Sequence, residues 1–337
     1  MRYLTVDTAT KISKIGLGTW QFGSGEWGYG KPYADQEAKA IVRRALELGV
    51  TLFDTAEIYG MGRSERILGL AISGHRDRVF LATKLFPLAP LPPVVEQRAV
   101  ASANRLGVSR LDLYQVHQPN PLIRDSIIMR GMQPLQRIGL VGEVGVSNYS
   151  LDRWRAAEKA LGARVLSNQV RYNLVAPSPA DGLIRYAEQA GRVVIAYSPL
   201  AQGFLSGRYD RAVRPQNRVR AYSTLFLPGN LDRAGELFRV VREVAQAHDA
   251  TPAQVALAWA IRSTCHSSSD RSISAAATLL SSCATLDAPG IAVTAGLRIA
   301  QASATCAGVA SCAWATSRTT RNSSPARSRL PGRKSAL

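Results

Sequence analysis

Cysteine is missing from the first 262 residues of this 337-residue chain, and all four cysteines lie between Cys265 and Cys312. They form no CxxC pair, so their spacing supports neither a zinc site nor a framework of disulfides. An acidic residue, Asp7, stands where a signal peptide has its apolar core. The uncharged run 299–317 is too rich in Ala, Ser and Thr to predict a membrane span. We therefore expect a cytoplasmic protein with no metal centre and no membrane partner.

Glutamate, phenylalanine, tyrosine and methionine are all absent from residues 263–337, which hold 15 serines. The same stretch contains eight of the 42 basic residues but only two of the 24 acidic ones. Charge alone does not show nucleic-acid binding, so neither the net charge of +18 nor the basic cluster near Lys334 predicts a specific nucleic-acid partner. We divide the chain into a domain at 1–262 and an atypical Ser/Ala/Arg/Cys-rich tail at 263–337, which we expect to be disordered or non-native.

The first part has a regular alternation that the tail lacks. Seven short apolar runs suit buried parallel strands, and they lie at 15–18, 51–54, 79–83, 111–116, 141–146, 165–170 and 193–197. Amphipathic helical patterns lie between and after them, at about 35–48, 64–71, 94–106, 124–138, 150–161, 179–190, 231–248 and 252–262. A strand recurring roughly every 30 residues favours a (β/α)8 barrel over an open doubly wound sheet.

Four residues with useful chemistry follow the ends of three expected strands. Asp54 and Lys84 end the second and third strands, Tyr59 follows five residues after Asp54, and His117 ends the fourth strand. In a parallel barrel these strand ends meet at one mouth. An ammonium beside a phenol favours the phenolate, so Lys84 is expected to lower the pKa of Tyr59 while Asp54 holds the ammonium in place. The imidazole is suited to contact a carbonyl oxygen or to relay a proton.

Each of these residues also has an ordinary explanation. A single Lys or Tyr at a strand end is usually a surface residue, and a single His usually belongs to the core or its rim. The combination of all four at one mouth is harder to explain in that way. It predicts a site that transfers a proton.

The ordered motifs of residues 1–262 resemble those of the aldo-keto reductases. The motifs are Gly16-Leu-Gly-Thr-Trp20, Asp54-Thr-Ala-Glu-Ile-Tyr-Gly60, Gly62-Arg-Ser-Glu65, Thr83-Lys84, Asp112-Leu-Tyr-Gln-Val-His117, Gly145-Val-Ser-Asn148, Asn168-Gln169 and Tyr197-Ser-Pro-Leu-Ala-Gln-Gly-Phe-Leu-Ser-Gly207. The resemblance implies a (β/α)8 barrel, bound NADPH and a catalytic tetrad of Asp54, Tyr59, Lys84 and His117.

The resemblance also implies which residues contact NADPH. Ser147, Asn148 and Gln169 match the residues that hold the nicotinamide carboxamide, and Tyr197 matches the aromatic residue that stacks on the ring. The full set of implied cofactor contacts is Trp20, Asp54, Ser147, Asn148, Gln169, Tyr197, Ser198, Pro199, Leu200, Gln202, Gly203 and Ser206. A barrel-layer aromatic, a helix cap and a flexible loop are the alternatives for Tyr197, for Ser147-Asn148 and for the loop after Tyr197.

Aromatic side chains near the ends of the first and third strands predict an apolar substrate pocket. They are Trp20, Trp27, Tyr29 and Phe86. Such a pocket suits a small carbonyl compound. Ordinary packing is the alternative for each of them.

The match to the family ends after Arg262. The eighth strand, with its Pro-Gly pair, and the following helix, which contacts the adenosine in this family, are missing or replaced. A shifted reading frame from about residue 263 is our hypothesis for the change in composition. The alternative is that the short run Ile291-Ala-Val-Thr294 substitutes for the eighth strand; otherwise the barrel stays open.

Two classes of function remain. The first is an NADPH-dependent oxidoreductase that reduces aldehydes or ketones to alcohols. The second is a catalytically silent cofactor-binding or regulatory barrel, or a truncated pseudoenzyme, which the lost eighth repeat favours. The sequence does not predict the oligomeric state.

Overall fold

Eight parallel strands close into a barrel in the order β10-β3-β4-β5-β6-β7-β8-β9. The computed structural model describes residues 1–6, 10–25, 32–177, 180–216, 218–262 and 291–295. The strands are β3 (Ile15–Gly18), β4 (Leu52–Asp54), β5 (Phe80–Leu85), β6 (Leu111–Val116), β7 (Val141–Ser147), β8 (Val165–Arg171), β9 (Val193–Tyr197) and β10 (Ile291–Ala295). The barrel and the seven strands expected from the sequence are confirmed.

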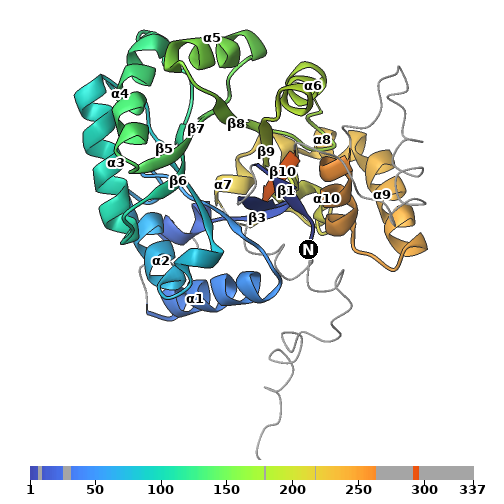
Figure 1. The fold of residues 1–337 in the computed structure, drawn as a ribbon. Coiled ribbons are helices and arrows are strands. Elements are labelled where there is room, and N and C mark those ends of the chain that lie inside the picture. Colours follow the sequence, from blue (N-terminus) through green and yellow to red (C-terminus); the bar gives the residue numbers. More distant parts are fainter. Residues whose placement is uncertain (7–9, 26–31, 178–179, 217, 263–290, 296–337) are drawn as a thin grey trace, which may run out of the picture.

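Helices alternate with the strands and surround the barrel (Figure 1). Within the described residues they are α1 (Pro32–Glu47), α2 (Arg63–Ile72), α3 (Pro92–Leu106), α4 (Asp125–Arg137), α5 (Leu151–Leu161), α6 (Ala180–Ala190), α7 (Arg218–Ala221), α8 (Pro228–Arg233), α9 (Gly235–Ala247) and α10 (Pro252–Arg262). Short 3-10 turns are η1 (Trp20–Gly23), η3 (Arg76–Arg78), η4 (Ala201–Ser206) and η5 (Thr224–Phe226). No helix of the described part is long and apolar enough to cross a membrane.

Local sequence explains where individual helices begin and end. The hydroxyl of Ser150 accepts a hydrogen bond from the Arg153 N–H and caps the start of α5. The same helix ends at Gly162, whose φ of 69° lies in the left-handed region that glycine adopts most readily. Pro92 at the first turn of α3 has no N–H to leave unsatisfied.

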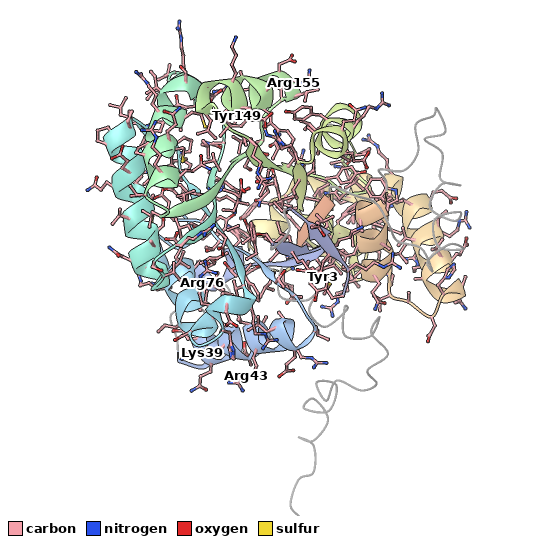
Figure 2. All side chains as sticks on the ribbon, viewed as in Figure 1. Tyr3, Lys39, Arg43, Arg76, Tyr149 and Arg155 are labelled. Atoms are coloured by element: carbon pink, nitrogen blue, oxygen red, sulfur yellow. The ribbon has the colours of Figure 1, made fainter. Side chains whose placement is uncertain are left out.

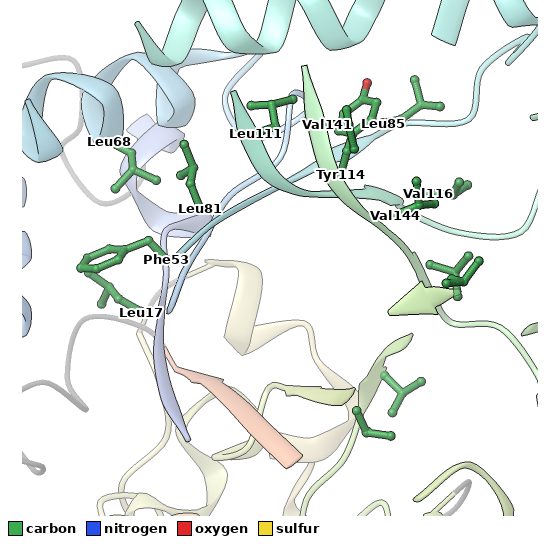
Figure 3. Packing of buried hydrophobic residues seen from close by; sticks show 14 of the residues in the cluster. Leu17, Phe53, Leu68, Leu81, Leu85, Leu111, Tyr114, Val116, Val141 and Val144 are labelled. Atoms are coloured by element: carbon green, nitrogen blue, oxygen red, sulfur yellow. The ribbon is translucent and has the colours of Figure 1, made fainter. Parts of the chain in front are cut away.

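The larger part of the core lies between the strands and the helices. Leu17, Phe53, Leu81, Tyr114 and Val144 alternate with interior residues along their strands and lie among the side chains of this buried cluster (Figure 3). The strands are nearly continuous runs of buried residues because helices cover one face and the barrel interior covers the other. Long charged side chains such as Lys39, Arg43 and Arg155 project from the outer surface instead (Figure 2).

A short hairpin, which the sequence analysis did not predict, closes the amino-terminal end of the barrel. Its strands are β1 (Tyr3–Thr5) and β2 (Lys11–Ser13), which pair antiparallel. Leu4 and Ile12 from the hairpin join a second buried cluster with Leu52 and Phe80, the first residues of β4 and β5. The interior is therefore packed at this end, and polar side chains collect toward the other.

The eighth position of the barrel is filled from beyond the boundary expected at residue 262. β10 pairs parallel with both β9 and β3, and Val293 is in register with Ala196 on one side and Ile15 on the other. The family-like eighth strand is therefore replaced by the alternative run, and the expectation of an open barrel is wrong. The rest of the expected tail, 263–290 and 296–337, lies outside the described residues.

The two-sided pairing of β10 generates a stability prediction. Val293→Pro removes an N–H from a strand with neighbours on both sides, whereas Val293→Ala keeps it. We expect the proline variant to unfold with a free energy roughly 1–3 kcal/mol lower than that of the alanine variant, because one buried backbone acceptor loses its donor. Urea denaturation of both variants measures the difference, and equal midpoints would show that β10 does not hold the barrel closed.

Candidate active site

The ammonium group of Lys84 is buried at the carboxyl end of β5. Its Nζ lies 2.6 Å from Oδ2 of Asp54, donates to the Thr55 carbonyl oxygen at 2.8 Å, and lies 3.3 Å from the Tyr59 hydroxyl. The Lys84 side chain has no exposed area. Burial acts to lower the pKa of Lys84, but Asp54 and Tyr59 outweigh it, so the pKa is raised and the ammonium stays charged.

Tyr59 lies next to this ammonium, whose Nζ is 5.0 Å from the centre of the phenol ring. Burial raises the pKa of its hydroxyl, and the charge and hydrogen bond of Lys84 only partly oppose that effect. Lys84 does act to lower the pKa of Tyr59, as expected from the sequence. The expected net lowering of that pKa is wrong, because burial raises it by more. At neutral pH the phenol keeps its proton and has a cation ready to stabilise the phenolate.

His117 is the fourth of the residues that the sequence predicts at this mouth. Its ring centre lies 5.6 Å from that of Tyr59 and 6.3 Å from that of Phe86, edge-on in both cases. Burial and the nearby charge of Lys84 lower the pKa of His117 to about 3. The imidazole is therefore neutral at physiological pH, and its Nδ1 has no hydrogen-bond partner in the described structure.

Polar groups expected at the carboxamide of a nicotinamide gather beside the tetrad. Ser147 donates to the Gln169 carbonyl oxygen at 2.9 Å, and the Asn148 side chain donates to the Ser147 hydroxyl at 3.1 Å. The Tyr197 hydroxyl donates to Oδ1 of Asn148 at 3.0 Å. In this structure the Gln169 amide donates to Oδ1 of Asp54 at 2.9 Å. These contacts connect the ends of β7, β8 and β9 with the buried ion pair.

The loop after β9 contains backbone conformations that most residues avoid. Ser198, Ala201 and Gln202 have φ angles of 51°, 47° and 59°, and Asn148 at the end of β7 has 62°. Such conformations cost free energy and cluster at functional sites. The implied contacts Pro199, Leu200, Gly203 and Ser206 lie in the same loop, where the Ser206 hydroxyl donates to the Gly203 carbonyl oxygen.

The four aromatic residues expected to line a pocket have different outcomes. Phe86 is half-buried and faces His117. Trp20 lies in η1, after β3, and is 46% exposed. Trp27 and Tyr29 lie outside the described residues. Within the described part, no cluster of three or more His, Cys, Asp or Glu side chains is suited to hold a metal ion.

Sequence reasoning missed the contacts that hold the Tyr59 segment. Glu57 accepts hydrogen bonds from the Phe86 N–H at 2.6 Å and from Arg98 at 2.9 Å, which joins the loops after β4 and β5. A Cβ atom on Gly60 would lie 2.2 Å from the Gly23 carbonyl oxygen, so the two segments meet through glycines. Gly60 belongs to a motif that the sequence shows. Its partner Gly23 is 37 positions away, and nothing in the sequence predicts that these two glycines are in contact.

Residues 14–289 match the model of the aldo/keto reductase family. This chain belongs to that family. An uncharacterised oxidoreductase of Mycobacterium tuberculosis is 56% identical over 261 residues, which cover 77% of this chain and 80% of the relative. That length is close to the 262 residues before the change in composition.

Solved structures support the same fold. The glycerol dehydrogenase of Gluconobacter oxydans is 26% identical, has a TM-score of 0.69, and is matched over 76% of this chain and 82% of its own. An aldo-keto reductase of Klebsiella pneumoniae in complex with NADPH is 24% identical and has a TM-score of 0.66. That match covers 93% of this chain and 92% of the other, and at this identity it supports the barrel alone.

The lowered pKa of His117 generates a prediction that needs neither cofactor nor substrate. A value of about 3 in the folded protein lies below the ordinary value of 6.5, so the imidazole stays neutral between pH 5 and 8. Proton NMR of the folded protein, which has four histidines, should show an imidazole resonance that does not move over this range and that disappears in His117→Gln. A midpoint near 6.5 for that resonance would contradict the prediction.

Proposed function

We propose that this oxidoreductase reduces aldehydes or ketones to alcohols with NADPH, and that Tyr59 is the general acid. The observation that carries the proposal is that one buried ammonium, Lys84 Nζ, lies within hydrogen-bond distance of both Asp54 and Tyr59. The neutral imidazole of His117 lies edge-on to the phenol ring, with the ring centres 5.6 Å apart. Membership of the aldo/keto reductase family supports the same chemistry.

The residues around the mouth fit a nicotinamide cofactor. Ser147, Asn148 and Gln169 offer the hydroxyl and amide groups that a carboxamide requires, since it both donates and accepts hydrogen bonds. Tyr197 is half-buried, and its ring is held by the hydrogen bond to Asn148. When bound, NADPH supplies the hydride for the carbonyl carbon. The residues of this chain bind and orient the cofactor and provide the proton.

Tyr59 gives its proton to the oxygen that becomes negative as the carbonyl is reduced. Burial keeps the phenol protonated before the reaction, and the Lys84 ammonium at 3.3 Å stabilises the phenolate that remains. Asp54 keeps Lys84 charged in an interior that otherwise favours the neutral amine. The ion pair therefore acts on the reaction through Tyr59.

His117 positions the substrate oxygen in this proposal. A neutral imidazole donates one hydrogen bond and brings no positive charge to compete with Lys84. Phe86 provides apolar surface beside it, and we propose that Trp20, Trp27 and Tyr29 contribute to the same pocket. This surface suits a small carbonyl substrate in the cytoplasm.

The alternative is a catalytically silent barrel that binds the cofactor. The observation that favours it is the change in composition after Arg262, because the residues that contact the adenosine in the resembled family follow that point. We propose that residues 1–262 together with β10 form the functional domain. Titration of protein fluorescence with NADPH, followed by an assay with aromatic and aliphatic aldehydes, separates binding without turnover from reduction.

Replacing the phenol generates the main test of the mechanism. Tyr59→Phe removes the transferable proton and keeps the ring, so kcat for aldehyde reduction should fall by about 10²–10⁴-fold. The dissociation constant for NADPH should stay within about twofold, because Tyr59 contacts Lys84 rather than the groups that suit the carboxamide. Tyr222→Phe, at a tyrosine that is 82% exposed, is the matched control and should keep full activity. Retained turnover in Tyr59→Phe would show that another group protonates the substrate.

A further inference from the structure

A polar row crosses the barrel interior from Lys84 of the tetrad. Lys84, Gln115, Gly145 and Ser167 are successive register partners across β5, β6, β7 and β8. Gln115 and Ser167 have no exposed area. Burying a side-chain amide costs free energy unless its hydrogen bonds are satisfied. The hydrogen-bond partners of Gln115 therefore indicate its role.

The partners of Gln115 fix the orientation of its amide. The Ser167 hydroxyl donates to Oε1 of Gln115 at 3.2 Å, and Nε2 of Gln115 lies 3.4 Å from Oδ1 of Asp54. An ionised carboxylate only accepts hydrogen bonds, so the NH₂ side of the amide must face Asp54. The carbonyl side then faces Ser167, which is the orientation in the structure.

Gly145 leaves the space in which these two side chains meet. A Cβ atom at this position would lie 2.3 Å from the Ser167 hydroxyl oxygen and 2.9 Å from Cγ of Gln115. Any larger residue would push the two side chains apart. The packing of Gln115 and Ser167 therefore explains, without any ligand, why the Gly145-Val-Ser-Asn148 motif begins with glycine.

Asp54 uses its two oxygens differently. Oδ2 faces Lys84, while Oδ1 accepts from Gln169 at 2.9 Å and faces the amide of Gln115. Gln169 follows Ser167 by two residues on β8 and so lies nearer to the mouth, and our proposed function assigns it to the cofactor. Gln115 lies deeper and is fully buried, so its contact with Asp54 does not depend on a ligand.

We propose that Gln115 is a positioning residue that, held by Ser167, keeps Oδ1 of Asp54 turned inward and Oδ2 on the Lys84 ammonium. The inference rests on the proposed function for its effect on catalysis, but not for its effect on the ion pair. Without the Gln115 amide, Oδ1 of Asp54 keeps only the donor from Gln169, so the carboxylate is held less firmly on Lys84.

The pKa of Lys84 is a measure of whether Gln115 positions Asp54. The titratable groups facing Lys84 are Asp54, Tyr59 and His117, and both Asp54 and Tyr59 act to raise the pKa of Lys84. Burial favours the neutral amine, so a weaker contact with Asp54 lowers the pKa of Lys84. A purely structural role of Gln115 would change the melting temperature without this shift.

The test is an NMR titration of lysine side chains in the full-length protein without cofactor. The chain has only seven lysines, and Lys84→Arg identifies the buried one. Gln115→Met replaces the amide by an apolar chain of similar length, and we expect the Lys84 midpoint to fall by roughly one pH unit, the size expected for one lost hydrogen bond to a buried ion. Ser167→Ala should shift it in the same direction by less.

The matched control is Gln133→Met, at a half-buried glutamine on α4 that donates to the Leu161 carbonyl oxygen at 2.9 Å. It should leave the Lys84 midpoint unchanged. With NADPH, Gln115→Met should lower kcat about tenfold, move the alkaline limb of its pH profile downward, and leave the cofactor dissociation constant within about twofold.

An unchanged Lys84 midpoint in a Gln115→Met variant that melts cooperatively would overturn the proposal. If that variant does not fold, Ser167→Ala decides, and an unchanged midpoint there has the same meaning. A wild-type protein that lacks NADPH-dependent reduction would contradict the proposed function instead, because the lysine titration needs no turnover.

Discussion

The buried ion pair of Lys84 and Asp54 is the interaction on which the rest of the site depends. An ammonium without exposed area is tolerated only when its charge and all its N–H groups are satisfied. Asp54, Thr55 and Tyr59 meet that demand, and they come from β4 and the loop that follows it. The need to satisfy one cation therefore holds the ends of two strands and the Tyr59 phenol in one arrangement. Removing either partner leaves an uncompensated buried charge, which costs more than the intact pair contributes.

The barrel places this polar pair above an apolar interior and below a strained rim. Leu52, Phe80 and the hairpin residue Leu4 fill the amino-terminal end with buried apolar side chains. At the other end, Asn148, Ser198, Ala201 and Gln202 have positive φ angles in the left-handed region. Local strain of this kind persists only when the surrounding structure is rigid. The closed eight-stranded barrel and the helices packed around it supply that rigidity. They hold the rim residues in their strained conformations.

Much of the barrel follows from the sequence because the signals are local. The seven apolar runs, the capping residue Ser150 and the glycine that ends α5 all act within a few positions. The hairpin was missed since its two strands have three residues each, too short for alternation to be recognised. The tetrad followed from strand ends and from the family resemblance. Contacts such as Glu57 with Arg98, or Gly23 with Gly60, join residues about 40 positions apart, and only the fold brings them together.

Closure of the barrel by β10 links the unusual end of the chain to the chemistry. β10 lies between β9, which ends in Tyr197, and β3, which leads into the turn that carries Trp20. An open seam at this position would leave unpaired backbone groups on both neighbours, and each of these strands positions an aromatic residue at the mouth. The ion pair lies farther along the sheet, on β4 and β5, where pairing is continuous. A weak eighth strand would therefore disturb the aromatic rim before it disturbed Lys84 and Asp54. In the proposed mechanism, cofactor binding and proton transfer thus depend on different parts of the same barrel.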